Sequence, residues 1–304
     1  MGLRSDALCF KFTEINLEAY VDIAKQLMDL SPRKIINRTR RLFGAESNGI
    51  EACDSIENLL GLEQFNGLRK MSRFSHGMVE IGDTKIYFND PTSLVGMLNE
   101  IFVRENYQFS SNSDQPYILD CGANIGIGVI YLKKRFPKSV IHAFEPEPVA
   151  FQFLKKNIEA NKLDNVYVHN SAVWIENGEI EFFSDGSWGG GISEKPGSKL
   201  IKVPTIDINK FLDRHVDFLK MDIEGAESKV IPHLADLIKE NVSRFFFEWH
   251  SMKDSKQDLG QILSMFGEAG FRYHIKEAAI RPTPFDYVPG GQMDSQLDVF
   301  LQRS

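Results

Sequence analysis

Apolar and polar positions follow two different periods in the larger, C-terminal part of the chain. Short apolar runs, such as YILDC at 117–121 and the FFF of SRFFFEWH at 243–250, are typical of strands buried on both faces. Between such runs, apolar residues recur every three or four positions, as in VAFQFLKKNIEANK at 149–162, which predicts helices. Strand and helix patterns follow each other in turn, so we expect an α/β fold with a mostly parallel sheet covered by helices.

The last two predicted strands have no helix between them, and we therefore expect the final strand to be antiparallel. A small β insertion is expected at 178–185, before a strand and a short helix at 200–214. The strands of the main sheet are expected at 117–121, 139–146, 165–173, 216–222, 243–250, 271–277 and 297–303, and the helices between them at 125–136, 149–162, 226–240 and 258–270.

The first 75 residues have a helical pattern of their own. NLEAYVDIAKQLMDL at 16–30 places its apolar residues on one stripe, and SIENLLGLEQF at 55–65 continues in the same style. A strand-like alternation follows at 77–90, and Pro91 with Ser93 is typical of the start of a helix. We therefore divide the chain into a helical N-terminal extension, 1–75, and an α/β domain, 76–304.

Composition narrows the class of protein. The 304 residues are 42% hydrophobic and 25% charged, which is ordinary for a soluble globular protein. The net charge of −7 argues against a nucleic-acid partner, which normally requires a basic face. The three cysteines are widely spaced, and the sequence has neither an apolar run of membrane-spanning length nor a secretory signal. We expect a cytoplasmic protein without a membrane span.

Candidate chemistry is sought at the carboxyl ends of the strands, because ligands of open parallel sheets bind there. The first strand ends in DCGANIG, a corner of small residues that leads into a helix. Such a corner lets backbone N–H groups approach a ligand closely, although a purely structural turn would use the same residues. Its spacing differs from the G-x-G-x-x-G of nicotinamide-binding proteins.

The next two strand ends favour a nucleoside ligand. Glu145, after the second strand, is placed to accept both hydroxyls of a ribose. After the third strand, Asn170 or Ser171 could hydrogen-bond an adenine edge, while Ala172 and Val173 could pack on its face. Both polar residues are equally typical of a turn, so this second assignment stays open.

The fourth and fifth strands supply acidic residues and a histidine. Asp222, Glu224 and Glu227 crowd one strand-to-helix junction, where acidic side chains also stabilise a helix N-terminus. That structural account explains Asp222 least well, because Asp222 is expected at the strand end itself. Glu248 and His250 are expected at the neighbouring strand end, where such a set could bind a divalent ion or supply a general base.

With these residues in order, the chain resembles the FkbM family of S-adenosylmethionine-dependent methyltransferases. The matching segments lie within residues 75–304 and are ILDCGANIG, HAFEPEP, NSAV, VPTIDINKFL, DFLKMDIEGAE and FEWH. The resemblance implies a Rossmann-like class I methyltransferase with a seven-stranded sheet and an antiparallel last strand. It further implies an O-methyltransferase whose acceptor is a small molecule or glycan, since family members commonly methylate hydroxyl groups of sugars or secondary metabolites.

The resemblance also implies which residues meet the cofactor. The corner faces the methionine part of S-adenosylmethionine, Glu145 takes the ribose, and the third strand end borders the adenine. The residues expected to bind the cofactor are Asp120, Gly122, Ala123, Asn124, Gly126, Glu145, Ser171 and Ala172.

For the chemistry we expect Asp222, Glu248 and His250 around the acceptor hydroxyl, with His250 or Asp222 as the base. In an alternative, Asp222 and Glu248 hold Mg²⁺, which orients and acidifies the hydroxyl. Glu224 and two loops are expected to shape the acceptor pocket. The loop residues are Trp188, beside three consecutive glycines, and Arg281, Asp286 and Tyr287 of the connection before the last strand.

Two rival functions remain. A nucleoside-binding scaffold or regulatory protein would keep the fold without catalysis, but it would need no base in the cleft. A nicotinamide-dependent oxidoreductase would need the G-x-G-x-x-G spacing and a Tyr-x-x-x-Lys pair. The N-terminal helices could cover the cleft, bind a partner or form a homo-oligomer.

Overall fold

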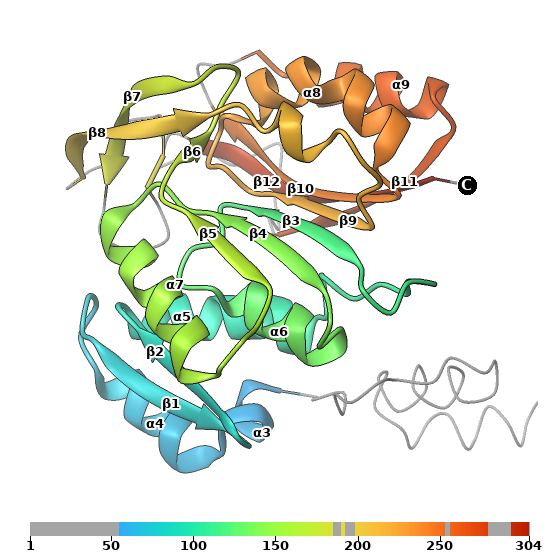
Figure 1. Ribbon diagram of the computed structural model, residues 1–304. Coiled ribbons are helices and arrows are strands. Elements are labelled where there is room, and N and C mark those ends of the chain that lie inside the picture. Colours follow the sequence, from blue (N-terminus) through green and yellow to red (C-terminus); the bar gives the residue numbers. More distant parts are fainter. Residues whose placement is uncertain (1–54, 185–189, 192–197, 253–255, 279–292, 304) are drawn as a thin grey trace, which may run out of the picture. The chain divides into compact units, whose positions relative to one another are not determined.

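The structure, a computed structural model, describes residues 55–184, 190–191, 198–252, 256–278 and 293–303 (Figure 1). The helix expected at 16–30 lies outside these ranges, as do Trp188, Arg281, Asp286 and Tyr287. Within the described ranges, the helices fall short of the length and hydropathy that a membrane span requires.

A seven-stranded sheet in the order β11-β12-β10-β9-β3-β4-β5 forms the core. Neighbouring strands pair in parallel except at β12, which is antiparallel to both β10 and β11. This arrangement confirms the predicted mostly parallel sheet with an antiparallel last strand. The strands are β3 (Tyr117–Cys121), β4 (Val140–Phe144), β5 (Val166–His169), β9 (Phe218–Met221), β10 (Arg244–Met252), β11 (Phe271–Glu277) and β12 (Met293–Arg303).

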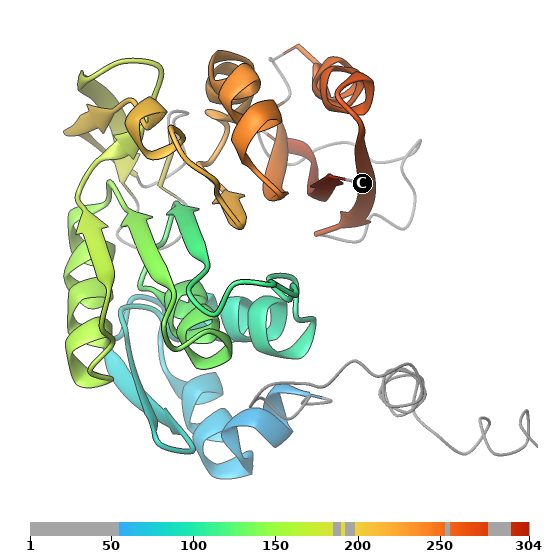
Figure 2. The same cartoon turned by 45° about the vertical axis from the view of Figure 1, so that its right-hand side comes forward.

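Helices cover both faces of this sheet, as Figures 1 and 2 show. One face carries α5 (Pro91–Leu98), α6 (Ile127–Arg135) and α7 (Pro148–Ala160), and the other carries α8 (Glu227–Asn241) and α9 (Leu259–Glu268). The double cover explains the FFF run in β10. Phe245 and Phe247 join the core that contains α8 and α9, whereas the ring of Phe246 lies against Tyr107 and Phe300.

The helix starts follow from local sequence. Asp90 caps α5 by accepting the N–H groups of Thr92 and Ser93, with Pro91 in the first turn. The predicted start is therefore confirmed, and the capping residue is Asp90. A single π-helical turn, η1 (Asn99–Val103), continues α5, and such turns are frequent at functional sites.

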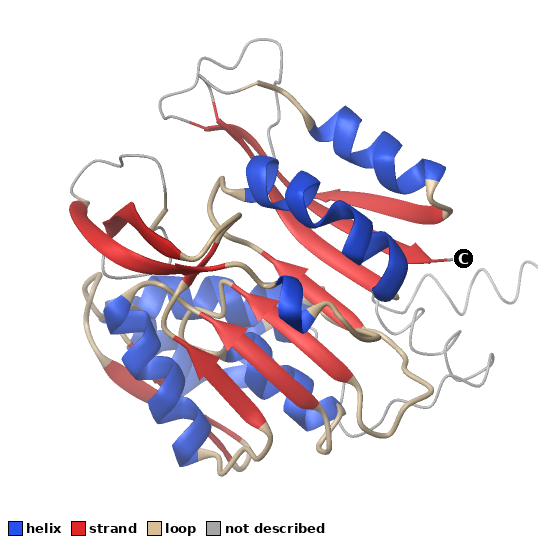
Figure 3. Ribbon diagram, turned by 45° about the horizontal axis from the view of Figure 1, so that its top comes forward, coloured by secondary structure: helices blue, strands red, loops and turns tan. Residues whose placement is uncertain are grey.

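The expected third strand, 165–173, is wrong as one strand. β5 ends at His169, and the chain then turns, with Asn170 donating its side-chain N–H to the backbone oxygen of Glu145. A separate short strand, β6 (Ala172–Val173), joins β7 (Gly178–Ser184) and β8 (Lys199–Ile206) in a three-stranded sheet. Figure 3 shows this small sheet beside the strand ends of the main one. The 3-10 turn η2 (Asn209–Phe211) follows as the expected short helix.

Before the main sheet lie α3 (Ile56–Leu60), α4 (Leu62–Lys70) and the hairpin β1 (Gly77–Ile81) with β2 (Thr84–Phe88). Two asparagines attach this hairpin: Asn157 of α7 and Asn161, which caps the C-terminus of that helix. Asn157 accepts the N–H of Tyr87 at 2.7 Å and donates to its carbonyl oxygen at 2.9 Å, and Asn161 does the same to Lys85 at 3.0 and 2.7 Å. The two side chains thus pair with β2 as a neighbouring strand would.

Candidate active site

A cavity of about 470 Å³ opens at the carboxyl ends of β3, β4 and β9. Its walls also include η1, the small sheet and the overhanging part of β10. Most of the residues predicted to bind a ligand line this cavity: Asp120, Gly122, Ala123, Asn124, Glu145, Ala172, Asp222, Glu224, Glu248 and His250. Gly126 and Ser171, predicted with them, do not line it.

The glycine corner is built around close backbone contact. Gly122 has φ +84°, and a Cβ atom there would overlap the backbone oxygen of Asp222. Gly126 has φ +88° and forms the N-cap of α6. Asn124 also has a left-handed backbone, φ 49°, which asparagine tolerates better than most residues. The corner thus brings the ends of β3 and β9 together without side chains between them.

Glu145 joins this corner to the end of β4. Its two carboxylate oxygens accept the N–H groups of Asn124 and Glu147, each at 2.7 Å. Glu145 is only 6% exposed, and this burial raises its pKa to about 7 despite the two hydrogen bonds. Because it lines the cavity, this carboxyl group can accept hydrogen bonds from hydroxyl groups of a ligand.

Lys220 lines the cavity and was not among the site residues predicted from the sequence. Its Nζ donates to the carbonyl oxygen of Gly122 at 2.5 Å and lies 3.5 Å from Asp120 Oδ1 and 3.6 Å from Asp222 Oδ2. Burial favours a neutral lysine, but the carboxylates of Asp222, Asp120 and Glu100 hold its pKa above the usual range. The only available signal was a lysine inside a buried strand, which requires acidic partners.

Glu248 and His250 do not lie at a strand end, contrary to the prediction. β10 runs on to Met252, past the end of β9 at Met221, so these two side chains overhang the cavity from within a strand. This part of β10 pairs with β12, where Glu248 lies opposite Asp298 and His250 opposite Gln296.

Glu100 of η1, Glu248 and Asp298 form a buried acidic cluster, with one oxygen of each within 4.8 Å of the others. Asp298 accepts from Asn106 Nδ2 at 2.9 Å, and Glu248 accepts from Gln296 Nε2. Burial, with repulsion from the carboxylate of Asp222, raises the pKa of Glu100 to about 7 and that of Asp298 to about 6, and it also raises the pKa of Glu248 well above its usual range. The sequence reading missed Glu100, which no pattern marks, and Asp298, whose signal was an acid within an apolar strand.

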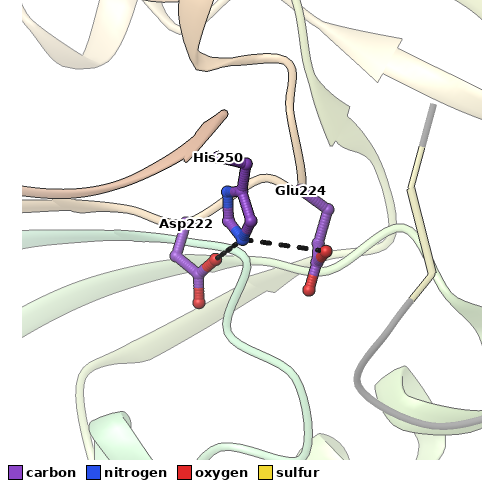
Figure 4. Close-up of side chains that lie close together, drawn as sticks. All are labelled: Asp222, Glu224 and His250. Carbon is purple, nitrogen blue, oxygen red and sulfur yellow. Dashed lines mark ion pairs between the residues drawn. The ribbon is translucent and has the colours of Figure 1, made fainter. Parts of the chain in front are cut away.

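Asp222, Glu224 and His250 form a second cluster, shown in Figure 4. His250 Nε2 lies 4.0 Å from Asp222 Oδ1 and 3.8 Å from Glu224 Oε2 (Figure 4). On the other side of the ring, Nδ1 lies 3.4 Å from Glu227 Oε1. Although burial favours a neutral ring, the carboxylates of Glu227, Glu224 and Glu248 raise the pKa of His250 well above its usual range. The two residues predicted to hold Mg²⁺, Asp222 and Glu248, therefore fall in different clusters.

The Methyltransferase FkbM domain family matches residues 120–273. Methyltransferase 1 of Beauveria bassiana (strain ARSEF 2860) is 26% identical over 222 residues, covering 64% of this chain and 88% of that protein. Methyltransferase sdnD of Sordaria araneosa is 40% identical over 62 residues, covering 20% of this chain and 24% of that protein.

Among solved structures, the SAM-dependent methyltransferase from Agrobacterium tumefaciens aligns with a TM-score of 0.48 at 11% identity. The alignment covers 77% of this chain and 72% of that one. The stretch matched by the family, 120–273, contains the glycine corner, Glu145, Lys220 and both cavity residues of β10.

Proposed function

Because this chain belongs to the FkbM methyltransferase family, as the sequence resemblance indicated, we propose that it transfers a methyl group from S-adenosylmethionine to a hydroxyl group. The acceptor we propose is a sugar, a glycan or a secondary metabolite. The observation that carries this proposal is one cavity in which the glycine corner and Glu145 face carboxylates of two other strands. A donor and an acceptor would meet between these two sides.

The donor side fits S-adenosylmethionine. Gly122 lines the cavity without a side chain, so a ligand could approach the backbone of the corner. Each oxygen of Glu145 accepts one backbone N–H and retains a lone pair for a ribose hydroxyl. Ala172, Val173 and Phe182 offer apolar contact for the adenine. When bound, S-adenosylmethionine supplies the electrophilic methyl group.

On the acceptor side, this chain must hold a hydroxyl in line and take up its proton. We assign the proton to Glu248. His250 is a poorer candidate than predicted, because both of its ring nitrogens face carboxylates. Glu248 lines the cavity, and Gln296 holds one of its oxygens through a hydrogen bond. Glu248 would take up the hydroxyl proton of the acceptor, while S-adenosylmethionine would supply the methyl group and leave as S-adenosylhomocysteine.

The donor assignment is tested by calorimetry with S-adenosylmethionine, S-adenosylhomocysteine and NAD. We expect the first two to bind and NAD not to bind; the reverse would overturn the proposal. A screen for radiolabelled methyl transfer to sugars, glycans and hydroxylated small molecules then tests the acceptor class. Binding of S-adenosylmethionine with no transfer to any hydroxyl would favour the binding-only alternative.

Glu248→Gln tests the base. We expect kcat to fall by about 10²- to 10³-fold, in the range of general base catalysis, while the Kd for S-adenosylmethionine changes little. Glu100→Gln is the matched control, because it removes one carboxylate from the same cluster on the side of η1. Equal losses in the two variants would contradict a specific role for Glu248 and indicate an effect of charge alone.

A further inference from the structure

The side-chain oxygens of Asp222 and Glu224 lie near His250 Nε2 at the spacing of ligands that share one metal ion. Nε2, Asp222 Oδ1 and Glu224 Oε2 all lie within 4.8 Å of one another. His250 is 5% exposed, and neither its Nε2 nor Asp222 Oδ1 has a hydrogen-bond partner among the described residues, although both atoms are buried. Buried polar atoms without partners are rare and require an explanation.

The distances exclude direct bonding between these side chains. A charge-assisted hydrogen bond from imidazole to carboxylate measures about 2.7–2.9 Å. The separations here, 4.0 Å to Asp222 and 3.8 Å to Glu224, are too long for that. They match two ligands of one ion, because ligands about 2.1 Å from a shared metal stand about 3 to 4.2 Å apart.

The remaining atoms of the same side chains are directed elsewhere. Asp222 Oδ2 faces Lys220 Nζ at 3.6 Å, and His250 Nδ1 faces Glu227 Oε1. A carboxylate behind a ligating histidine is the usual arrangement in metal sites, where it fixes the ring tautomer. Asp222 and His250 thus each direct one remaining atom toward the shared centre.

The turn after β9 is built to hold this geometry. Glu227 accepts the N–H groups of Ile223 at 2.7 Å and Gly225 at 2.8 Å, which closes the turn. Glu224 has a left-handed backbone, φ 57°, an unfavourable state for a glutamate that persists only where its surroundings enforce it. Its carboxylate faces His250 as a result.

We propose that Asp222, Glu224 and His250 bind one divalent metal ion, with Glu227 as the residue that orients the histidine. This deepens the proposed function, since the three ligands line the cavity of the proposed methyl transfer. The ligand set differs from the predicted Asp222 and Glu248. Two carboxylate oxygens and one imidazole nitrogen suit Mn²⁺, Fe²⁺ or Zn²⁺ better than Ca²⁺, which prefers oxygen alone.

The test measures metal binding directly, without methyl transfer. Metal-free full-length protein is titrated with Mn²⁺, and binding is followed by the loss of the free-ion signal in electron paramagnetic resonance. We expect one ion per chain, and nitrogen modulation in the pulsed spectrum from His250. Glu224→Gln should weaken binding about tenfold or more, and His250→Gln should also abolish the nitrogen modulation.

Asp298→Asn is the matched control, because it alters the other acidic cluster. It should leave Mn²⁺ binding unchanged. Unfolding midpoints and calorimetry with S-adenosylmethionine on every variant separate a lost ligand from a lost fold. No binding of Mn²⁺, Zn²⁺ or Fe²⁺ to the folded protein would overturn the proposal. So would binding that is lost in Asp298→Asn but retained in Glu224→Gln and His250→Gln. Failure of the methyl donor to bind would instead contradict the proposed function alone.

Discussion

Gly122 is the residue with the least freedom to change in this cavity. Its φ of +84° and the absence of room beside the backbone oxygen of Asp222 exclude a side chain. We expect Gly122→Ala to lower the free energy of unfolding by about 2–4 kcal/mol, from backbone strain and overpacking together. Urea denaturation checks this value.

Gly67→Ala is the control for that change. Gly67 lies in α4 with no atom within 4 Å of the added Cβ. Alanine in a helix should leave stability unchanged or raise it by less than about 1 kcal/mol. If Gly122→Ala changed the free energy of unfolding as little as Gly67→Ala does, the corner would tolerate a side chain and the prediction would be wrong.

Glu145 makes donor binding depend on pH. Its raised pKa, about 7, means that the free protein holds this carboxyl neutral below neutral pH. Ribose hydroxyls donate to the ionised form and favour it, so affinity should rise with pH. We expect the Kd for S-adenosylmethionine to fall about three- to tenfold from pH 6 to pH 8, measured by calorimetry.

In Glu145→Gln, affinity should be weaker, and this part of its pH dependence should vanish. Any pH dependence of the Kd that remains in this variant comes from groups other than Glu145, including those of the ligand. Wild-type affinity that is flat, or that falls over this range, would remove Glu145 from ribose binding.

The sequence predicted the cavity residues that immediately follow strands, because the end of a parallel strand is visible in the hydrophobic pattern. Lys220, Glu100 and Asp298 were missed for a different reason. They lie inside apolar runs or on a helix, and their role depends on contacts across long stretches of sequence. The hydrophobic pattern does not predict that β12 lies beside η1.

At the scale of elements, asparagine side chains connect α7 to β2 by hydrogen bonds to the strand backbone, where a neighbouring strand would use its own backbone. Asn157 is fully buried, and it also donates to the carbonyl oxygen of Ile125 at 2.8 Å. Asn157→Ala would leave three backbone groups without this partner. We expect it to lower the free energy of unfolding by about 2–4 kcal/mol in urea denaturation.

Asn161→Ala makes the matched comparison, because Asn161 forms the same pair of bonds with Lys85 at a more exposed place. Water can replace those bonds, so the loss should be about 1 kcal/mol or less. If Asn161→Ala lowered the free energy of unfolding as much as Asn157→Ala, the difference in burial between the two asparagines would not determine the size of the loss.

Most elements could be predicted from sequence because their apolar period is strong and Pro or Gly marks their ends. The split of 165–173 into β5 and β6 could not. Its physical cause is the hydrogen bond from Asn170 to the backbone oxygen of Glu145, a contact between two strand ends. Apolar residues resume at Ala172 and Val173 directly after the turn, so the pattern reads as one strand.

At the scale of the whole molecule, acidic side chains are concentrated in the cavity. Among the described residues that line it, the basic side chains are Arg104 and Lys220, together with His250. They are outnumbered by the acidic side chains Glu100, Asp120, Glu145, Glu147, Asp222, Glu224, Glu248 and Asp298. A ligand with a positive charge should therefore bind more tightly than its neutral counterpart.

S-adenosylmethionine carries a sulfonium charge that S-adenosylhomocysteine lacks. We expect about tenfold tighter binding of the charged donor, and similar tightness for sinefungin, which carries an ammonium group at the same place. Calorimetry at one pH compares the three. Tighter binding of S-adenosylhomocysteine would mean that the carboxylates are neutral or distant from the sulfonium.

The position of β12 in the sheet affects the folding of the nascent chain. It lies between β10 and β11, and its residues Gln296 and Asp298 stand opposite His250 and Glu248. A ribosome synthesises it after every other strand of the sheet. Until residues 293–303 leave the exit tunnel, β10 and β11 have no partner between them. The nascent chain therefore exposes the unpaired edge of the hydrophobic strand β10, which makes this interval a point for chaperone capture or aggregation.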